Sequence, residues 1–95
     1  MTVSIGRNVG DVPMPLGEWR RFRRDVRGAL GDVRTYVADA RTVGEWGGVS
    51  EESRTWVAPV ATADVPALVS AMAELAARYR QDAIAVTVGT TTLAA

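Results

Sequence analysis

The two ends of the chain carry the pattern that most restricts its fold. Residues 2–5 (Thr-Val-Ser-Ile) and 83–88 (Ala-Ile-Ala-Val-Thr-Val) alternate apolar residues with small or polar ones. Alternation with a period of two is typical of strands that bury one face. Because two such strands can pair side by side, the sequence predicts that residues 1–95 close into a single domain.

Two helices are predicted between these strands. The first begins near Pro15 and ends before Gly31, and the second follows Thr62 and Asp64, either of which is a suitable N-cap. In each helix the apolar residues recur at steps of three or four, which places them on one stripe. The stripes consist of Leu16, Trp19, Phe22, Val26, Ala29 and Leu30 in the first helix, and of Val65, Leu68, Val69, Met72, Leu75, Ala76 and Tyr79 in the second.

Two more strands are predicted between the helices, at residues 33–43 and 54–60, with a glycine-rich and acidic turn at residues 44–51. Residues 90–93 extend the last strand. The order is therefore strand, helix, strand, strand, helix, strand. Since each helix has one apolar stripe, both can cover the same face of a sheet. This pattern predicts an α+β fold of the ferredoxin-like βαββαβ type, with a four-stranded antiparallel sheet whose first and third strands lie in the middle.

The available side chains exclude several kinds of chemistry. The sequence has no His and no Cys, and all 11 of its basic residues are Arg. The commonest general base, the commonest metal ligand and every thiolate or lysine nucleophile are therefore missing. The formal net charge is zero, so no overall field attracts nucleic acid or an anionic membrane. These features favour a non-catalytic protein without a metal or cofactor.

The predicted sheet has one face that the helices do not cover. The second and third predicted strands carry apolar residues on both sides, so either Tyr36 and Trp56 or the neighbouring Val37 and Val57 lie on that face. Exposed apolar patches often mark interaction surfaces. The sequence therefore predicts a homodimer, unless the hairpin or arginine side chains fold over the patch.

The polar face of the first helix is rich in arginine. Arg20, Arg24 and Arg27 fall on one stripe, which can bind a phosphate or an acidic partner or can simply be a solvated surface. Trp46, in the turn beside Glu45, is a further candidate contact if it is exposed, since Trp is favoured at binding hot spots. The acidic residues of this turn match no calcium loop, so no metal site is predicted.

A second alternative involves the loop Gly6–Gly10. A glycine-rich loop between a strand and a helix can hold an anion with its backbone N–H groups. An acylphosphatase-like enzyme of this fold uses an Arg in such a loop and an Asn on a separate strand. Arg7 and Asn8 are the corresponding candidates here. Asn8 lies in the same loop as Arg7, which departs from that arrangement.

Several short motifs are spread over nearly the whole chain. They are Gly6-Arg7, Glu18-Trp19 with Phe22 and Val26, Gly44-Glu45-Trp46-Gly47, Glu52-Ser53, and Tyr79-Arg80-Gln81-Asp82-Ala83-Ile84. With these motifs the chain resembles a family of small bacterial proteins of unknown function with the same order of strands and helices. Small proteins of actinobacteria and their phages are also similar in size and composition. The resemblance implies the fold and no activity.

Together these observations predict a non-catalytic protein-interaction domain, whose partner is a host protein if the chain is encoded by a phage. The sequence shows no export signal and no apolar segment of membrane-spanning length, so a cytoplasmic location without a membrane partner is expected. Nucleic acid is not expected as a partner. The candidate partner-binding residues are Arg20, Arg24, Arg27, Tyr36, Trp46 and Trp56.

Overall fold

The computed structural model describes residues 1–31, 40–46 and 49–89, and it describes no side chains for residues 40–46 and 49. Two 14-residue helices alternate with short strands. The elements are β1 (Thr2–Gly6), β2 (Asn8–Val9), β3 (Val12–Pro13), α1 (Leu16–Ala29), β4 (Ala40–Trp46), β5 (Val49–Val57), the 3₁₀ turn η1 (Thr62–Asp64), α2 (Val65–Arg78) and β6 (Ala85–Thr87).

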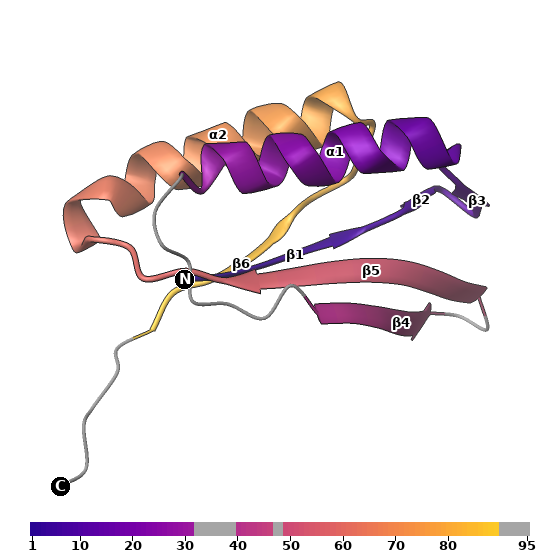
Figure 1. Cartoon of the computed structure of the whole chain (residues 1–95), viewed down its shortest axis with the longest axis horizontal. Coiled ribbons are helices and arrows are strands. Elements are labelled where there is room, and N and C mark those ends of the chain that lie inside the picture. Colours follow the sequence, from indigo (N-terminus) through magenta and orange to yellow (C-terminus); the bar gives the residue numbers. More distant parts are fainter. Residues whose placement is uncertain (32–39, 47–48, 90–95) are drawn as a thin grey trace, which may run out of the picture.

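The main sheet has the strand order β4–β5–β1–β6, and every neighbouring pair is antiparallel. Both helices lie side by side on one face of this sheet (Figure 1). Both helices lie where their apolar stripes predict them. Gly31, predicted to end the first helix, follows α1 with a φ of 91°, a conformation that glycine adopts readily. The α+β class, the two helices and the antiparallel pairing are thus confirmed.

The sheet departs from the predicted ferredoxin-like sheet in two ways. The predicted Gly6–Asp11 loop instead contains β2, which pairs with β3 in a separate two-stranded sheet. The last strand, β6, has three residues instead of the predicted 83–88, and it pairs with only Thr2–Ser4 of β1. The extension at residues 90–93 lies outside the described residues.

The hairpin strands between the helices extend further into the predicted turn than expected, and β5 ends at Val57 rather than at residue 60. In the described part, β4 begins at Ala40, and β5 begins at Val49 rather than at residue 54. The register pairs Trp46 with Val49, so most of the predicted turn at residues 44–51 belongs to the two strands. The acidic Glu51 and Glu52 therefore lie within β5, where the rest of the fold can contact them.

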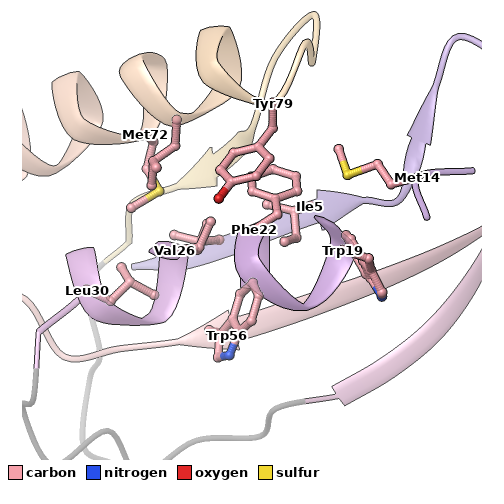
Figure 2. Packing of buried hydrophobic residues seen from close by; sticks show 11 residues of the cluster. Ile5, Met14, Trp19, Phe22, Val26, Leu30, Trp56, Met72 and Tyr79 are labelled. Atoms are coloured by element: carbon pink, nitrogen blue, oxygen red, sulfur yellow. The ribbon is translucent and has the colours of Figure 1, made fainter. Parts of the chain in front are cut away.

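The hydrophobic core lies between the helices and the inner face of the sheet (Figure 2). Trp19, Phe22 and Val26 of α1 are fully buried, in agreement with the predicted stripe. The ring of Phe22 stacks on Tyr79 with a centroid distance of 4.5 Å and meets Trp19 edge-on at 6.0 Å. The other members of the cluster are Val3, Ile5, Met14, Leu30, Trp56, Met72 and Leu75.

Trp56 belongs to this core and not to the uncovered face. It pairs in register with Val3, which is fully buried, and paired residues point to the same side of a sheet. Trp56 is only 5% exposed. Of the two alternatives, the structure therefore has Val57 and not Trp56 on the uncovered face, while Tyr36 and Val37 lie outside the described residues.

The described part of the uncovered face is mainly small or polar. Ser4 and Thr55 pair there, and their hydroxyl groups form a hydrogen bond of 2.9 Å. On β6, Ala85 and Thr87 are exposed while Val86 packs against the core, as the alternation predicts. Val57 is the large apolar residue of this face in β5, at 45% exposure. These side chains form no extended apolar patch.

Candidate functional site

The arginine-rich side of α1 is the strongest candidate site. Packing of Trp19, Phe22 and Val26 into the core fixes the rotation of the helix. The helical period of 3.6 residues then turns Arg20, Arg24 and Arg27 outward, and all three are exposed. The structure therefore brings these three predicted residues together on one side of α1, whereas it does not describe the side chains of Tyr36 and Trp46.

The flank of α1 that carries Arg20, Arg24 and Arg27 borders a cavity of about 310 Å³. The cavity is lined by Arg20, Arg23, Arg24, Arg27 and Trp56. Trp56 comes from β5 and lies under α1 (Figure 2). Trp56, whose face the sequence left open, is thus brought next to the predicted arginines.

The indole of Trp56 presents an unusual polar group to its surroundings. Its Nε1–H is buried, and it has no hydrogen-bond acceptor in the part of the chain that the structure describes. Leaving a buried donor without an acceptor costs about 1–3 kcal/mol. Trp19 Nε1 is likewise buried without an acceptor, but Trp19 does not line the cavity.

The positive charge of the flank is only weakly neutralised. Arg20 and Arg27 form no ion pair with any described residue. Arg24 Nε is 3.8 Å from Asp25 Oδ1, and its side chain is 74% exposed, so this ion pair contributes little. Arg23 lies over the ring of Trp19, 5.5 Å from its centroid. The cavity is therefore bordered by cationic groups that can accept an anion.

The alternative anion site around Arg7 is arranged differently. Arg7 Nε donates to the backbone oxygen of Met14 at 2.8 Å, and its Nη1 forms an ion pair of 2.9 Å with Glu52 Oε2. These two contacts link the β2–β3 hairpin to β5. Arg7 therefore has a structural role that accounts for its position.

The neighbouring backbone donor of this loop is also occupied. The N–H of Asn8 donates to Glu51 Oε1 at 2.9 Å, and its carbonyl oxygen accepts from Gln81 Nε2 at 3.0 Å. The carboxylate of Glu51 lies over Gly6, where a Cβ atom would be 2.1 Å from Oε1. The loop thus binds a carboxylate of its own chain at the place where the acylphosphatase-like hypothesis puts a substrate phosphate.

Sequence reasoning did not find a polar contact between the helices. The hydroxyl group of Tyr79 donates a hydrogen bond to Asp25 Oδ2, and Arg78 Nη1 lies 3.9 Å from the same oxygen. Burial, followed by the hydrogen bond to Asp25, raises the pKa of Tyr79 above its ordinary value of 10.0. The spacing of Tyr79 predicted a core residue and contained no signal for its partner.

The raised pKa of Tyr79 predicts a loss of stability in alkali. Below pH 10, protonated Tyr79 makes its full contribution to the free energy of unfolding. This contribution is lost as the pH rises through the folded-state pKa, because the unfolded protein gives up the tyrosine proton at a lower pH than the folded protein does. The chain has no Lys and no Cys, so tyrosines dominate titration in this range. In a Tyr36→Phe variant, the phenolate absorbance of folded Tyr79 should titrate above the value measured in guanidinium chloride. Equal midpoints in the two solvents would contradict the prediction.

No family model, curated protein or solved structure matches this chain. Among residues 1–31, 40–46 and 49–89, no helix is long and apolar enough to cross a bilayer. In the same part of the chain, no three acidic side chains lie close enough to hold a metal ion. The function is therefore argued from the geometry of the site alone.

Proposed function

We propose that the protein is a non-catalytic interaction domain that binds an acidic segment of a partner protein. The binding surface is the flank of α1 that carries Arg20, Arg24 and Arg27. The observation that carries this proposal is the exposure of three arginines on one stripe around a cavity, with no ion pair to Arg20 or Arg27 from the described residues. Guanidinium groups bind carboxylates through paired hydrogen bonds, which gives orientation as well as attraction.

The scaffold of this surface is a variant of the ferredoxin-like fold. The strand order β4–β5–β1–β6 supports this description, since the first and third long strands occupy the middle of the sheet. The β2–β3 hairpin is an addition between β1 and α1. In such a scaffold both helices lie on one face of the sheet. The side of α1 that carries the arginines then lies next to β5.

Binding of nucleic acid and activity as a hydrolase are two functions with less support. The zero net charge provides no long-range attraction for nucleic acid, and Trp56 is too deeply buried to stack on a base. For a hydrolase that uses Arg7, the guanidinium group is already engaged with Glu52, whose carboxylate repels a phosphate, and with the carbonyl of Met14. An acidic protein segment requires neither change.

A peptide-binding experiment tests the proposed function. A ten-residue glutamate peptide, labelled with a fluorophore, should bind the protein, while a glutamine peptide of the same length should not. The Arg20→Gln/Arg27→Gln variant should bind the glutamate peptide about tenfold more weakly, because it loses two charge-assisted contacts. Fluorescence anisotropy at 50 mM salt measures both affinities.

The matched control is the Arg21→Gln/Arg78→Gln variant, which removes the same number of charges from exposed positions outside the cavity. Its affinity should change less than about threefold, since exposed charges are partly screened even at this salt concentration. Equal weakening in the two variants would mean that only net charge matters. That result, or no binding of the glutamate peptide, would refute the proposed function.

The expected homodimer stays a prediction. The described part of the uncovered sheet face offers Ser4, Thr55, Ala85 and Thr87 rather than a large apolar patch. This surface gives self-association no particular support, and it is not included in the proposed function. Sedimentation velocity at increasing protein concentration measures the assembly state directly.

A further inference from the structure

The main sheet has a long open edge at β4. This strand runs from Ala40 to Trp46, and β5 is its only neighbour in the part of the chain that the structure describes. All seven residues pair with β5 in an unbroken register that starts with Ala40 opposite Thr55, so no bulge interrupts the strand. The outer side of such a strand presents a row of backbone N–H and C=O groups that a further strand can bind. The opposite edge, β6, has only three residues.

The arginines of α1 lie on the β4 side of the molecule. Asp25 marks the side of α1 that faces α2, because its carboxylate contacts Arg78. With about 100° of rotation per residue, Arg20 and Arg27 lie about 140° and 160° around the helix from Asp25. The cavity beside them is lined by Trp56 of β5, the strand that pairs with β4. Figure 1 shows α1 in front of α2 and running along the length of β5.

We propose that the acidic segment of the partner binds as an extended strand on the outer edge of β4, with carboxylates at alternate positions facing the arginines of α1. This inference rests on the proposed function, and it names the conformation of the partner and the spacing of its acidic residues. Every second side chain of an added strand lies on the helix side of the sheet. Backbone hydrogen bonds to β4 would then provide affinity, and the alternate carboxylates would provide specificity.

The distances agree with this arrangement. Neighbouring strands are about 4.8 Å apart, so a strand outside β4 lies about 10 Å from β5, which an arginine and a glutamate side chain can span together. Along the helix axis, Arg24 is about 6 Å from Arg20 and about 4.5 Å from Arg27. Alternate residues of a strand are about 6.7 Å apart. Three alternating glutamates can therefore each meet a guanidinium group, whereas three adjacent glutamates place at least one carboxylate on the far face of the sheet.

Peptides of identical composition test the arrangement of the charges. One ten-residue peptide alternates three glutamates with threonines, a second has the three glutamates adjacent, and a third spaces them by three and four residues, as on one face of a helix. Fluorescence anisotropy at 50 mM salt should show that the alternating peptide binds at least fivefold more tightly than the other two. Equal affinities for the alternating and adjacent peptides, or tightest binding of the third peptide, would overturn the inference.

N-methylation tests the strand pairing separately from the charge. Alternate residues of a strand direct their N–H groups to opposite edges, so only one set of peptide N–H groups can bond to β4. Two versions of the alternating peptide carry three methyl groups, either on the amide nitrogens of the glutamates or on those of threonines between them. One version should bind at least tenfold more weakly than the unmodified peptide, and the other should stay within threefold. Each version is the control for the other, because their charges are equal.

Hydrogen exchange of the backbone provides a second readout. The amides of β4 that do not bond to β5 should exchange at least tenfold more slowly when the alternating peptide is bound. The outward amides of β6, at the other end of the sheet, are the control and should not change. If the outer amides of β4 are instead protected in the free protein, increasingly so at higher protein concentration, a second copy of the chain occupies this edge and the inference is wrong.

The outcomes separate this inference from the proposed function. If the glutamate peptides bind and Arg20→Gln/Arg27→Gln weakens them, but both methylated versions bind like the unmodified peptide, the added strand is refuted while the proposed function stands. If the methylated versions differ but Arg20→Gln/Arg27→Gln binds like the wild type, a strand binds β4 without the arginines, which refutes both the proposed function and the placement of the carboxylates. If no glutamate peptide binds, the proposed function fails and this inference fails with it.

Discussion

Replacement of Phe22 with alanine is expected to lower the free energy of unfolding by about 4 kcal/mol. Phe22 is fully buried, and its ring contacts both Trp19 of its own helix and Tyr79 at the end of α2. Alanine would remove these contacts and leave a cavity between the helices and the sheet. A domain of this size has a total stability of only about 5–15 kcal/mol, so the loss is a large share of it.

Urea denaturation monitored by circular dichroism measures the effect of Phe22→Ala. The matched control is Arg24→Ala in the same helix, whose side chain is 74% exposed and should change stability by less than about 0.5 kcal/mol. The midpoint of thermal unfolding should fall by at least about 15 °C for Phe22→Ala. A loss below about 1.5 kcal/mol would mean that the helix interface repacks around the cavity, contrary to the close packing described here.

Replacement of Arg7 with alanine is expected to cost about 2 kcal/mol of stability. The guanidinium group satisfies the carbonyl oxygen of Met14 and the carboxylate of Glu52, and both contacts are partly shielded from solvent. Without it, the β2–β3 hairpin keeps the hydrogen bond from the N–H of Asn8 to Glu51 but loses its ion pair with β5. The amide of Met14, which donates to the backbone oxygen of Arg7, should then exchange its hydrogen faster.

The control for Arg7→Ala is Arg78→Ala, because Arg78 is 63% exposed and its ion pair with Asp25 spans 3.9 Å. That variant should lose less than about 0.5 kcal/mol. Hydrolysis of acetyl phosphate is measured in parallel. If the wild type hydrolyses it and a stable Arg7→Ala protein does not, Arg7 acts on a substrate, and its structural role would not be the main one.

The elements with the strongest periodicity were those that the sequence predicted best. Alternation at residues 2–5 predicted β1, and the stripes through Phe22 and Met72 predicted the two helices. Each of these patterns extends over enough residues to distinguish the period of a strand from that of a helix. Strands β2 and β3 have two residues each, too few for a period of two to be recognised. In the folded protein they pair with each other and are joined to β5 through Arg7 and Asn8.

The early start of β5 was missed for a related reason. Residues 50–53 are Ser-Glu-Glu-Ser between glycines and a strand, a composition typical of a solvated turn. In the folded protein, Glu51 accepts from the N–H of Asn8 and Glu52 pairs with Arg7. These partners are more than 40 positions away in the sequence, so local composition cannot reveal them.

The candidate site was predictable only in part. The spacing of Arg20, Arg24 and Arg27 was sufficient to place them on one stripe of a helix. The orientation of Trp56 was not predictable, because Val57 beside it is also apolar and either residue fits the inner face. Pairing of Trp56 with buried Val3 decides between them, and this register is a property of the whole sheet.

The place of β1 inside the sheet has a consequence for synthesis of the chain. β1 is synthesised before both of the strands that become its neighbours, since Thr2 pairs with both Val57 and Thr87. Such distant pairings make folding slow compared with a helical bundle of similar size. Val3 and Ile5 of β1 therefore stay without their native neighbours until residue 87 has been made, and during this time apolar side chains are open to non-native contacts.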